Sequence, residues 1–362
     1  MSWEWRECAL RTAYLLSTDI LEQATYFWFD TTRRSCVFRS HLVLAHVVSH
    51  PVPHARAYRR MPWMMIDPPY RAIDPSLQVL PAPGLHSLVY EKDFPDIDTF
   101  SEEVCKELNA RPLHQPPLLW TLIRLKNEKN DSIKLNTRVG ALEFGVGEGR
   151  SLAAIAESLR ENLGEENVRL AGFDSFHGLP EDWIPEWKKG SFSQDGVAVE
   201  VDGADIVPGM FDTTVPSFFT NKKTGYPSWK SQGIPIRLVH VDCDLYASAK
   251  TVLEHLGAAL KTTEEFMRGT AGCCYVVFDE LVGYDDYKKH EMRALYEFAR
   301  DNKDVFLLDV VGSDGREVSG DPMRYFTPEE ACAHRAVLRL RPRLSYHEDE
   351  YFEIDAHDGP IE

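Results

Sequence analysis

The chain has 362 residues, of which 43% are hydrophobic and 27% are charged. This balance excludes an intrinsically disordered chain and allows a sizeable buried core. The formal net charge of −17 disfavours bare nucleic acid as a partner, because like charges repel at long range. No apolar run approaches the roughly 18 to 20 residues that a membrane helix needs, so we expect no membrane partner.

The cysteines and the first residues of the chain favour the cytoplasm. Residues 1–21 lack the basic-then-apolar layout of a secretory signal. The seven cysteines are odd in number, and three of them, Cys243, Cys273 and Cys274, lie in apolar, strand-like segments. This usage suits buried free thiols in a reducing compartment better than a disulfide framework.

Residues 1–135 are predicted to form a helical and irregular N-terminal extension. Within it, residues 5–29 have apolar positions near helical spacing and predict an amphipathic helix. The proline-rich segment 51–95 disfavours long regular elements. Residues 118–129 then predict a short helix that leads into the core.

Residues 136–330 alternate strand-like and helix-like patterns, which predicts an α/β fold with a mostly parallel sheet. Strands are expected at residues 139–144, 168–173, 236–241 and 273–278, and helices at residues 151–162, 247–260 and 288–300. Residues 305–311 and 323–326 are expected to close the sheet as a hairpin at its edge. Residues 331–362 are read as a C-terminal extension that begins helical and basic and ends in a flexible acidic segment.

A glycine-rich turn follows the first predicted strand of this domain. Gly145, Gly147 and Gly149 lie in residues 141–151 (ALEFGVGEGRS) and permit a tight turn with close backbone approach to a ligand. Dinucleotide-binding enzymes place a similar turn here, so the glycines alone do not identify the cofactor.

Two neighbouring residues favour S-adenosylmethionine (SAM) over a dinucleotide. Arg150 stands where the dinucleotide pattern has glycine or alanine. Glu148 lies at the start of the next helix, where a carboxylate would repel a pyrophosphate. SAM has no phosphate, and Glu143 could hold its ammonium directly or through water. The sequence therefore predicts a SAM site that includes Glu143 and the glycine turn, and an NAD-dependent oxidoreductase is disfavoured.

An acidic residue follows the second predicted strand. Asp174 stands where a carboxylate accepts hydrogen bonds from both hydroxyls of a ribose. The alternative is an ordinary loop carboxylate, but the glycine turn upstream favours the cofactor role. We include the next residue, Ser175, in the predicted cofactor site.

Four carboxylates follow two later strands of the predicted sheet. Asp242 and Asp244 follow one strand, and Asp279 and Glu280 follow the next. Because the carboxyl ends of parallel strands converge on one edge of a sheet, we expect these acids to cluster. Such a cluster repels itself unless protons or a cation offset the charge.

A divalent cation such as Mg²⁺ fits this cluster, because it takes oxygen ligands. It would lower the pKa of a substrate hydroxyl, and a carboxylate that is not a ligand could act as general base. The alternative is helix capping, by Asp244 for one helix and by Asp279 or Glu280 for the next.

Four ordered segments resemble motifs of the TylF/MycF-type (macrocin O-methyltransferase-like) SAM-dependent methyltransferases. The segments are residues 172–183 (GFDSFHGLPEDW), 208–216 (PGMFDTTVP), 241–248 (VDCDLYAS) and 277–280 (VFDE). The resemblance implies a Rossmann-like class I methyltransferase fold with a seven-stranded, mostly parallel sheet and helices on both faces. It also implies SAM, Mg²⁺ and methylation of a hydroxyl, often on a sugar.

Carried over residue by residue, the resemblance makes Asp242, Asp279 and Glu280 the metal ligands and Asp244 the general base. Glu280 stands where the family has aspartate, which lengthens one ligand by a methylene. Met210 stands where the family has tryptophan. The N-terminal region, which helps to shape the substrate pocket in this family, is longer here, so the acceptor is expected only to be a small hydroxylated molecule such as a sugar or a phenol.

Two further alternatives remain open at this point. The chain could be a metal-independent SAM methyltransferase whose acids serve as bases and caps. It could also be a non-catalytic SAM-binding protein that interacts with partners through its N-terminal region. Family analogy adds the expectation of a homodimer.

Overall fold

The computed structural model describes residues 94–113, 115–130, 138–269, 272–314 and 335–343, with the backbone of residues 29–30, 35–36 and 86–87. The chain divides into two units, Met1–Met65 and Ile66–Glu362. In the first unit, β1 (Phe29–Asp30) pairs with β2 (Ser35–Cys36). The helix predicted over residues 5–29 lies outside the described residues except at its last residue.

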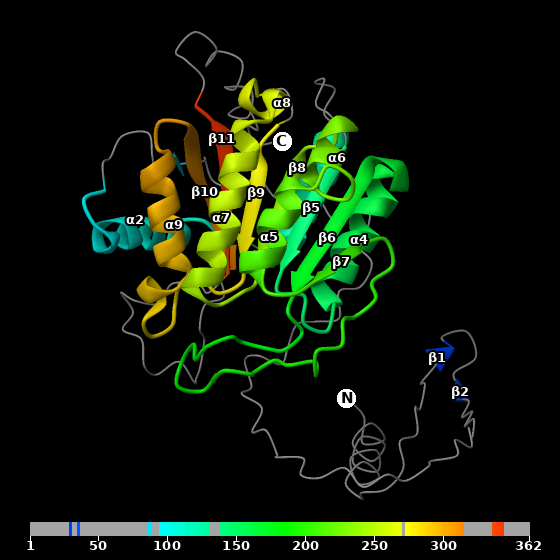
Figure 1. Ribbon diagram of the computed structural model, residues 1–362, viewed down its shortest axis with the longest axis horizontal. Coiled ribbons are helices and arrows are strands. Elements are labelled where there is room, and N and C mark those ends of the chain that lie inside the picture. The colour runs from blue at the N-terminus through cyan, green and yellow to red at the C-terminus, as the bar shows by residue number, and fades with distance from the viewer. Residues whose placement is uncertain are drawn as a thin grey trace, which may run out of the picture. The chain divides into compact units, whose positions relative to one another are not determined.

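The second unit holds a nine-stranded sheet (Figure 1). Its strands are β3 (His86–Ser87), β4 (Pro112–Leu113), β5 (Val139–Phe144), β6 (Val168–Asp174), β7 (Asp205–Pro208), β8 (Ile236–Val241), β9 (Cys274–Phe278), β10 (Phe306–Asp314) and β11 (Ala336–Pro342). The order is β3-β10-β11-β9-β8-β5-β6-β7, with β4 beside β10. Apart from the two-residue strands β3 and β4, this is the predicted seven-stranded Rossmann-like class I methyltransferase sheet.

The direction in which the sheet grows sets the place of the site. Strands β5 to β9 are parallel to one another. From β5 the chain adds β6 and β7 on one side and then crosses to add β8 and β9 on the other. In open α/β sheets, ligands bind outside the carboxyl ends of the strands at such a reversal. The site is therefore expected where β5 and β8 end.

The edge hairpin corrects one prediction. Its first strand is β10, as expected, but its partner is β11 and not residues 323–326, which lie outside the described residues. β11 is antiparallel to β10 and also to β9, so it lies inside the sheet. Residues 336–342 therefore belong to the sheet domain and are not the helical start of a C-terminal extension.

Helices cover both faces of the sheet. They are α2 (Ile97–Asn109), α3 (Pro117–Asn130), α4 (Arg150–Leu163), α5 (Phe211–Thr220), α6 (Tyr226–Ser231), α7 (Tyr246–Lys261), α8 (Glu264–Met267) and α9 (Glu291–Asn302), with the 3₁₀ turns η1 (Glu165–Asn167) and η2 (Tyr287–Lys289). Helices α3, α4, α7 and α9 match predicted helices to within about three residues at each end.

Along each buried strand, side chains point alternately into two separate hydrophobic cores. Phe144 and Val241 face a core shared with α2 and with α5 to α9. Ala141 and Leu238 face a core shared with α3 and α4. Figure 1 shows α5, α7 and α9 side by side on the near face. Because both faces are covered, β9 reads as a continuous apolar run in the sequence.

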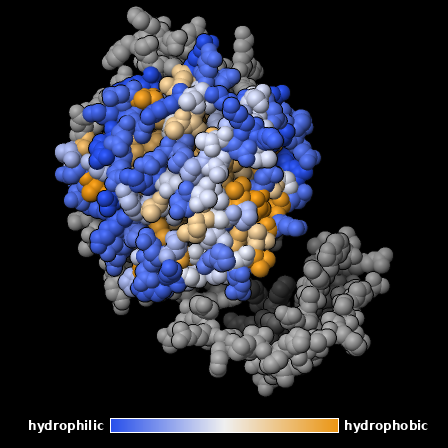
Figure 2. All heavy atoms as spheres, in the orientation of Figure 1, coloured by the Kyte–Doolittle hydropathy of each residue, from blue (hydrophilic) through white to orange (hydrophobic). Residues whose placement is uncertain are grey.

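The segment 175–204 joins β6 to β7 without a helix or strand and runs beneath the carboxyl ends of the strands in Figure 1. The Trp183 ring lies 5.4 Å from the Tyr284 ring, which follows β9. Trp183 is buried, whereas Phe192, Val197 and Met210 are exposed apolar residues. The face drawn in Figure 2 is largely hydrophilic, with apolar residues gathered at its lower right. The segment therefore crosses from the glycine-turn side of the sheet to the side of the acids.

Within the described ranges, no helix is both long enough and apolar enough to span a membrane.

Candidate active site

The glycine turn connects β5 to α4 at the predicted edge of the sheet. Gly145 has φ +98°, and a Cβ there would lie 1.7 Å from the carbonyl oxygen of Asp242. Only glycine fits this backbone contact, because any side chain would collide with a neighbouring strand end. Gly145 therefore brings the glycine turn directly against the first residue of the predicted metal set.

The other two glycines shape the turn differently. A Cβ on Gly147 would meet nothing within 4 Å, so the turn is open on that side. Gly149 has φ +80° and lies against the side chains of Val199 and Val201. The segment between β6 and β7 thus folds back over the end of the turn. Open space over Gly147 leaves room for a ligand beside the backbone.

Glu148 and Arg150 form an ion pair with each other at the start of α4, and both side chains are more than half exposed. This pair offsets the charge of Glu148, so the repulsion of a phosphate that we inferred from the sequence is weaker than a lone carboxylate would give. The argument against a dinucleotide then depends mainly on Arg150 in place of a small residue.

Asp174 ends β6 and is tied to the turn by its side chain. Its Oδ2 accepts a hydrogen bond from the Gly147 N–H at 2.8 Å, and its Oδ1 accepts one from the Phe176 N–H at 2.7 Å. Each oxygen keeps a lone pair for a further donor such as a ribose hydroxyl. Ser175 accepts from the His177 N–H at 3.1 Å and shapes the loop that follows.

Glu143 is completely buried near the end of β5. Its Oε1 lies 2.8 Å from Nδ1 of His240 on β8. Its Oε2 is buried and has no hydrogen-bond partner in the part of the chain that the structure describes. A buried carboxylate oxygen without a partner is costly, so this atom is a candidate for a contact with a donor that comes from a ligand.

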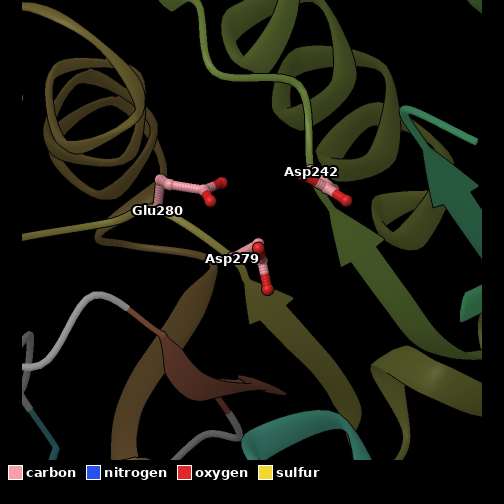
Figure 3. Close-up of side chains that lie close together, drawn as sticks. All are labelled: Asp242, Asp279 and Glu280. Atoms are coloured by element: carbon pink, nitrogen blue, oxygen red, sulfur yellow. The ribbon is translucent and has the colours of Figure 1, made fainter. Parts of the chain in front are cut away.

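Asp242, Asp279 and Glu280 converge as predicted. Each offers a carboxylate oxygen, and the three oxygens lie within 4.8 Å of one another. Figure 3 shows Asp242 at the end of β8 and the other two after β9, with the Glu280 carboxylate pointing toward Asp242. Three oxygens at this separation suit a hard divalent cation.

Asp244 follows Asp242 by two residues and is buried. Its φ is +62°, a left-handed conformation that residues other than glycine seldom adopt. The helix that follows has Leu245 at its N-cap and no side-chain capping hydrogen bond. Helix α9 likewise has His290 at its N-cap without a side-chain cap. Capping of these two helices therefore does not explain the acids.

Mutual repulsion and burial shift the pKa values of the acids apart. Burial, reinforced by Asp279, raises the pKa of Asp242 well above its ordinary value and raises that of Asp244 to about 7. Burial and Asp279 also raise the pKa of Glu280. Burial is the largest influence on Asp279 and opposes its ionisation, but Arg335, His240 and a hydrogen bond with Glu280 together outweigh burial and lower that pKa. A cation bound among these oxygens would offset the repulsion.

Two residues beside the acids were not assigned to the site from the sequence. From the sequence, Glu291 and its neighbour His290 could reach the site from their helix, but the sequence does not decide this, and Arg335 was missed. Arg335, just before β11, places its Nε 2.6 Å from Oδ1 of Asp279. Glu291, the first residue of α9, places Oε1 3.4 Å from the backbone nitrogen of Cys243, between the two aspartates. Glu291 lies next to His290 in a helix near the acids, but its sequence position does not show that it is buried.

Comparison with known proteins finds similar solved structures but does not assign the chain to a family. No family model and no curated protein matches the chain. Among solved structures, it is similar to the calicheamicin methyltransferase CalS11 (20% identity, TM-score 0.37, covering 71% of this chain and 97% of that one). It is also similar to the O-methyltransferase NovP (13%, 0.34, 67% and 98%) and to cofactor-bound Rv0187 from MTB (13%, 0.31, 70% and 100%). Because these TM-scores are low, we draw no conclusion from the similarities, and we assign the fold from the order of the strands in the sheet.

Proposed function

We propose that this chain is a SAM-dependent O-methyltransferase that acts on a hydroxyl of a small molecule, such as a sugar or a phenol, with the help of Mg²⁺. The observation that carries the proposal is the contact between Gly145 and Asp242. It joins the turn proposed for the methyl donor to the acids proposed for the metal, at the reversal of the sheet. Donor and acceptor would therefore meet at one place, as group transfer requires.

The glycine turn would carry the cofactor along the open side of Gly147. Asp174 fits the ribose, because both of its oxygens are held in place by backbone N–H groups and still have free lone pairs. Glu143 fits the ammonium through its unpartnered Oε2. Ser175, next to Asp174, would line the same site.

The acids would prepare the acceptor. Asp242, Asp279 and Glu280 would hold the cation, which when bound would supply Lewis acidity to the acceptor hydroxyl. The buried Oε2 of Glu280 has no hydrogen-bond partner in the described part of the chain, as expected of a ligand atom. Asp244 would accept the proton of that hydroxyl, and a pKa of about 7 suits a general base at neutral pH.

The ion pair between Arg335 and Asp279 favours a second candidate, a metal-independent methyltransferase. In that case the guanidinium supplies part of the positive charge, and Asp244 still serves as the base. Full activity after treatment with EDTA would favour this candidate over the metal-assisted one.

The direct test is isothermal titration calorimetry of the full chain with S-adenosylhomocysteine, with and without Mg²⁺. We expect micromolar binding that becomes tighter with Mg²⁺, followed by methyl transfer from SAM to hydroxylated acceptors in a screen. Binding without turnover on any acceptor would favour a non-catalytic SAM-binding protein. No binding in either condition would contradict the proposal.

A further inference from the structure

Glu291 is a fully buried carboxyl to which the proposed function gives no role. It begins α9, far along the chain from the acids that follow β8. Its Oε1 lies 3.4 Å from the backbone nitrogen and 3.6 Å from the Sγ of Cys243. Cys243 separates Asp242 from Asp244, so Glu291 contacts the turn formed by these three residues, which we call the acidic turn.

The turn that Glu291 contacts is tight and strained. Asp244 has a left-handed φ of +62°, and the Leu245 N–H donates to the Cys243 carbonyl at 2.6 Å. The Asp242 N–H is held by the carbonyl oxygen of Phe144 at 2.9 Å. Backbone strain of this kind persists only where the surrounding structure holds it. Between these two backbone hydrogen bonds, the Cys243 N–H points to the Glu291 carboxyl.

The second oxygen of Glu291 indicates that this is more than ordinary packing. Oε2 is buried and has no hydrogen-bond partner in the ranges that the structure describes. Leaving such an atom unpaired costs stability, and an apolar residue of similar size would avoid that cost. Burial together with the neighbouring Asp244 raises the pKa of Glu291, which favours its neutral form. A glutamine would then reproduce both its shape and its acceptor oxygen.

We propose that Glu291 is a positioning residue that holds the Asp242–Asp244 turn so that the Asp242 carboxylate faces Asp279 and Glu280. The inference rests on the proposed function, because it gives the turn the task of binding a divalent cation. Glu291 does not touch the cation or the substrate. It acts through the Cys243 backbone, as the outer partners of metal ligands do.

The test uses the full chain with Glu291→Met, which removes the acceptor, and Glu291→Gln, which keeps it. Mn²⁺ affinity is measured by calorimetry, beside S-adenosylhomocysteine affinity and the melting temperature. We expect Glu291→Met to weaken Mn²⁺ binding by about 10- to 100-fold. The S-adenosylhomocysteine affinity measured without metal should stay within about twofold, and Glu291→Gln should restore Mn²⁺ affinity to within about threefold of the unmodified chain.

Glu297→Met is the matched control. Glu297 lies on the same helix, but its carboxylate accepts from the Tyr246 hydroxyl at 2.8 Å and from Lys250 at 2.6 Å, outside the acidic turn. This variant should melt at a lower temperature while keeping the Mn²⁺ affinity of the unmodified chain. If Glu291→Met does not fold, Glu291→Asp, which withdraws the carboxyl by one methylene, is expected to show the same loss.

Unchanged Mn²⁺ affinity in Glu291→Met, or a glutamine variant as defective as the methionine one, would overturn the inference. Equal weakening in the Glu297 control would overturn it too, because the effect would then be one of general stability. Absence of Mn²⁺ binding by the unmodified chain would contradict both the metal-assisted function and the inference. The titration of the unmodified chain therefore separates the two failures.

Discussion

The sheet contains two groups of buried charges that are arranged in opposite ways. Near the start of β8 and β9, Arg237 forms an ion pair with Glu128, which also accepts from the Tyr275 hydroxyl at 2.8 Å. Close by, the almost fully buried Asp309 accepts from Arg339 at 2.9 Å and from Arg341 at 2.6 Å. Every acid in this first group has a basic partner, as buried charges need.

At the carboxyl ends of the same strands, acids face other acids. Asp242, Asp244 and Glu280 have raised pKa values, and the described ion pair in this group is the one between Arg335 and Asp279. The comparison teaches that burial alone does not mark a functional acid. A partner offsets the cost of burying an acid, whereas burial among like charges lowers stability and points to a ligand or a reaction.

The variant Asp242→Asn tests the difference between the two groups of acids most strongly. We expect it to lower turnover by at least about 1000-fold, because it removes a proposed cation ligand, and to leave the S-adenosylhomocysteine affinity measured without metal within about twofold. It should also stabilise the metal-free protein by about 1 kcal/mol, because it relieves repulsion. Kinetics, calorimetry and urea unfolding measure the three effects. Loss of S-adenosylhomocysteine binding would contradict the assignment of Asp242.

Glu128→Gln makes the same chemical change in the paired group and should have the opposite effect on stability. It leaves the buried Arg237 without its counter-charge, which costs about 3–5 kcal/mol. Turnover of the folded fraction should stay within about twofold, because this group lies away from the acids. Urea unfolding measures the first quantity and initial rates measure the second. Equal stability changes in the Glu128 and Asp242 variants would contradict the claim that the two groups of acids affect stability in opposite ways.

The pH dependence of stability gives a smaller effect. The pKa of Asp244 is raised to about 7 in the folded chain, so between its ordinary value and about 7 the folded state binds more protons than the unfolded state. Stability of the metal-free protein should therefore fall as pH rises from about 5 to about 8, by on the order of 2–3 kcal/mol. Urea unfolding at several pH values checks this. A rise in stability over the same range would have the wrong sign.

The buried strands and the acids at their ends could be predicted from the sequence for a shared physical reason. Strands such as β9 are covered on both faces, so they are apolar throughout, and the polar residues that follow mark the edge where ligands bind. β11 was missed because Arg339 and Arg341 make it read as a basic helix. Asp309 offsets both charges, and that contact spans about thirty residues of sequence.

Glu291 and Arg335 could not be assigned for a related reason. Each reaches the acids from an element whose own pattern shows only a charged residue at a boundary. Their roles depend on how α9 and β11 pack against the ends of β8 and β9. The motifs of the acidic turns predict which oxygens converge, but they contain nothing about the side chains that support those turns.

The central claim, that the crowded acids form a cation site, is tested most directly by calorimetric melting with and without Mg²⁺. The unmodified chain and Asp242→Asn are compared at about pH 8, above the pKa of about 7 of Asp244. Mg²⁺ at about 100 times its dissociation constant should stabilise the unmodified chain by about 2.7 kcal/mol and leave the variant unchanged. Equal responses of the two proteins, or no response in either, would contradict the account.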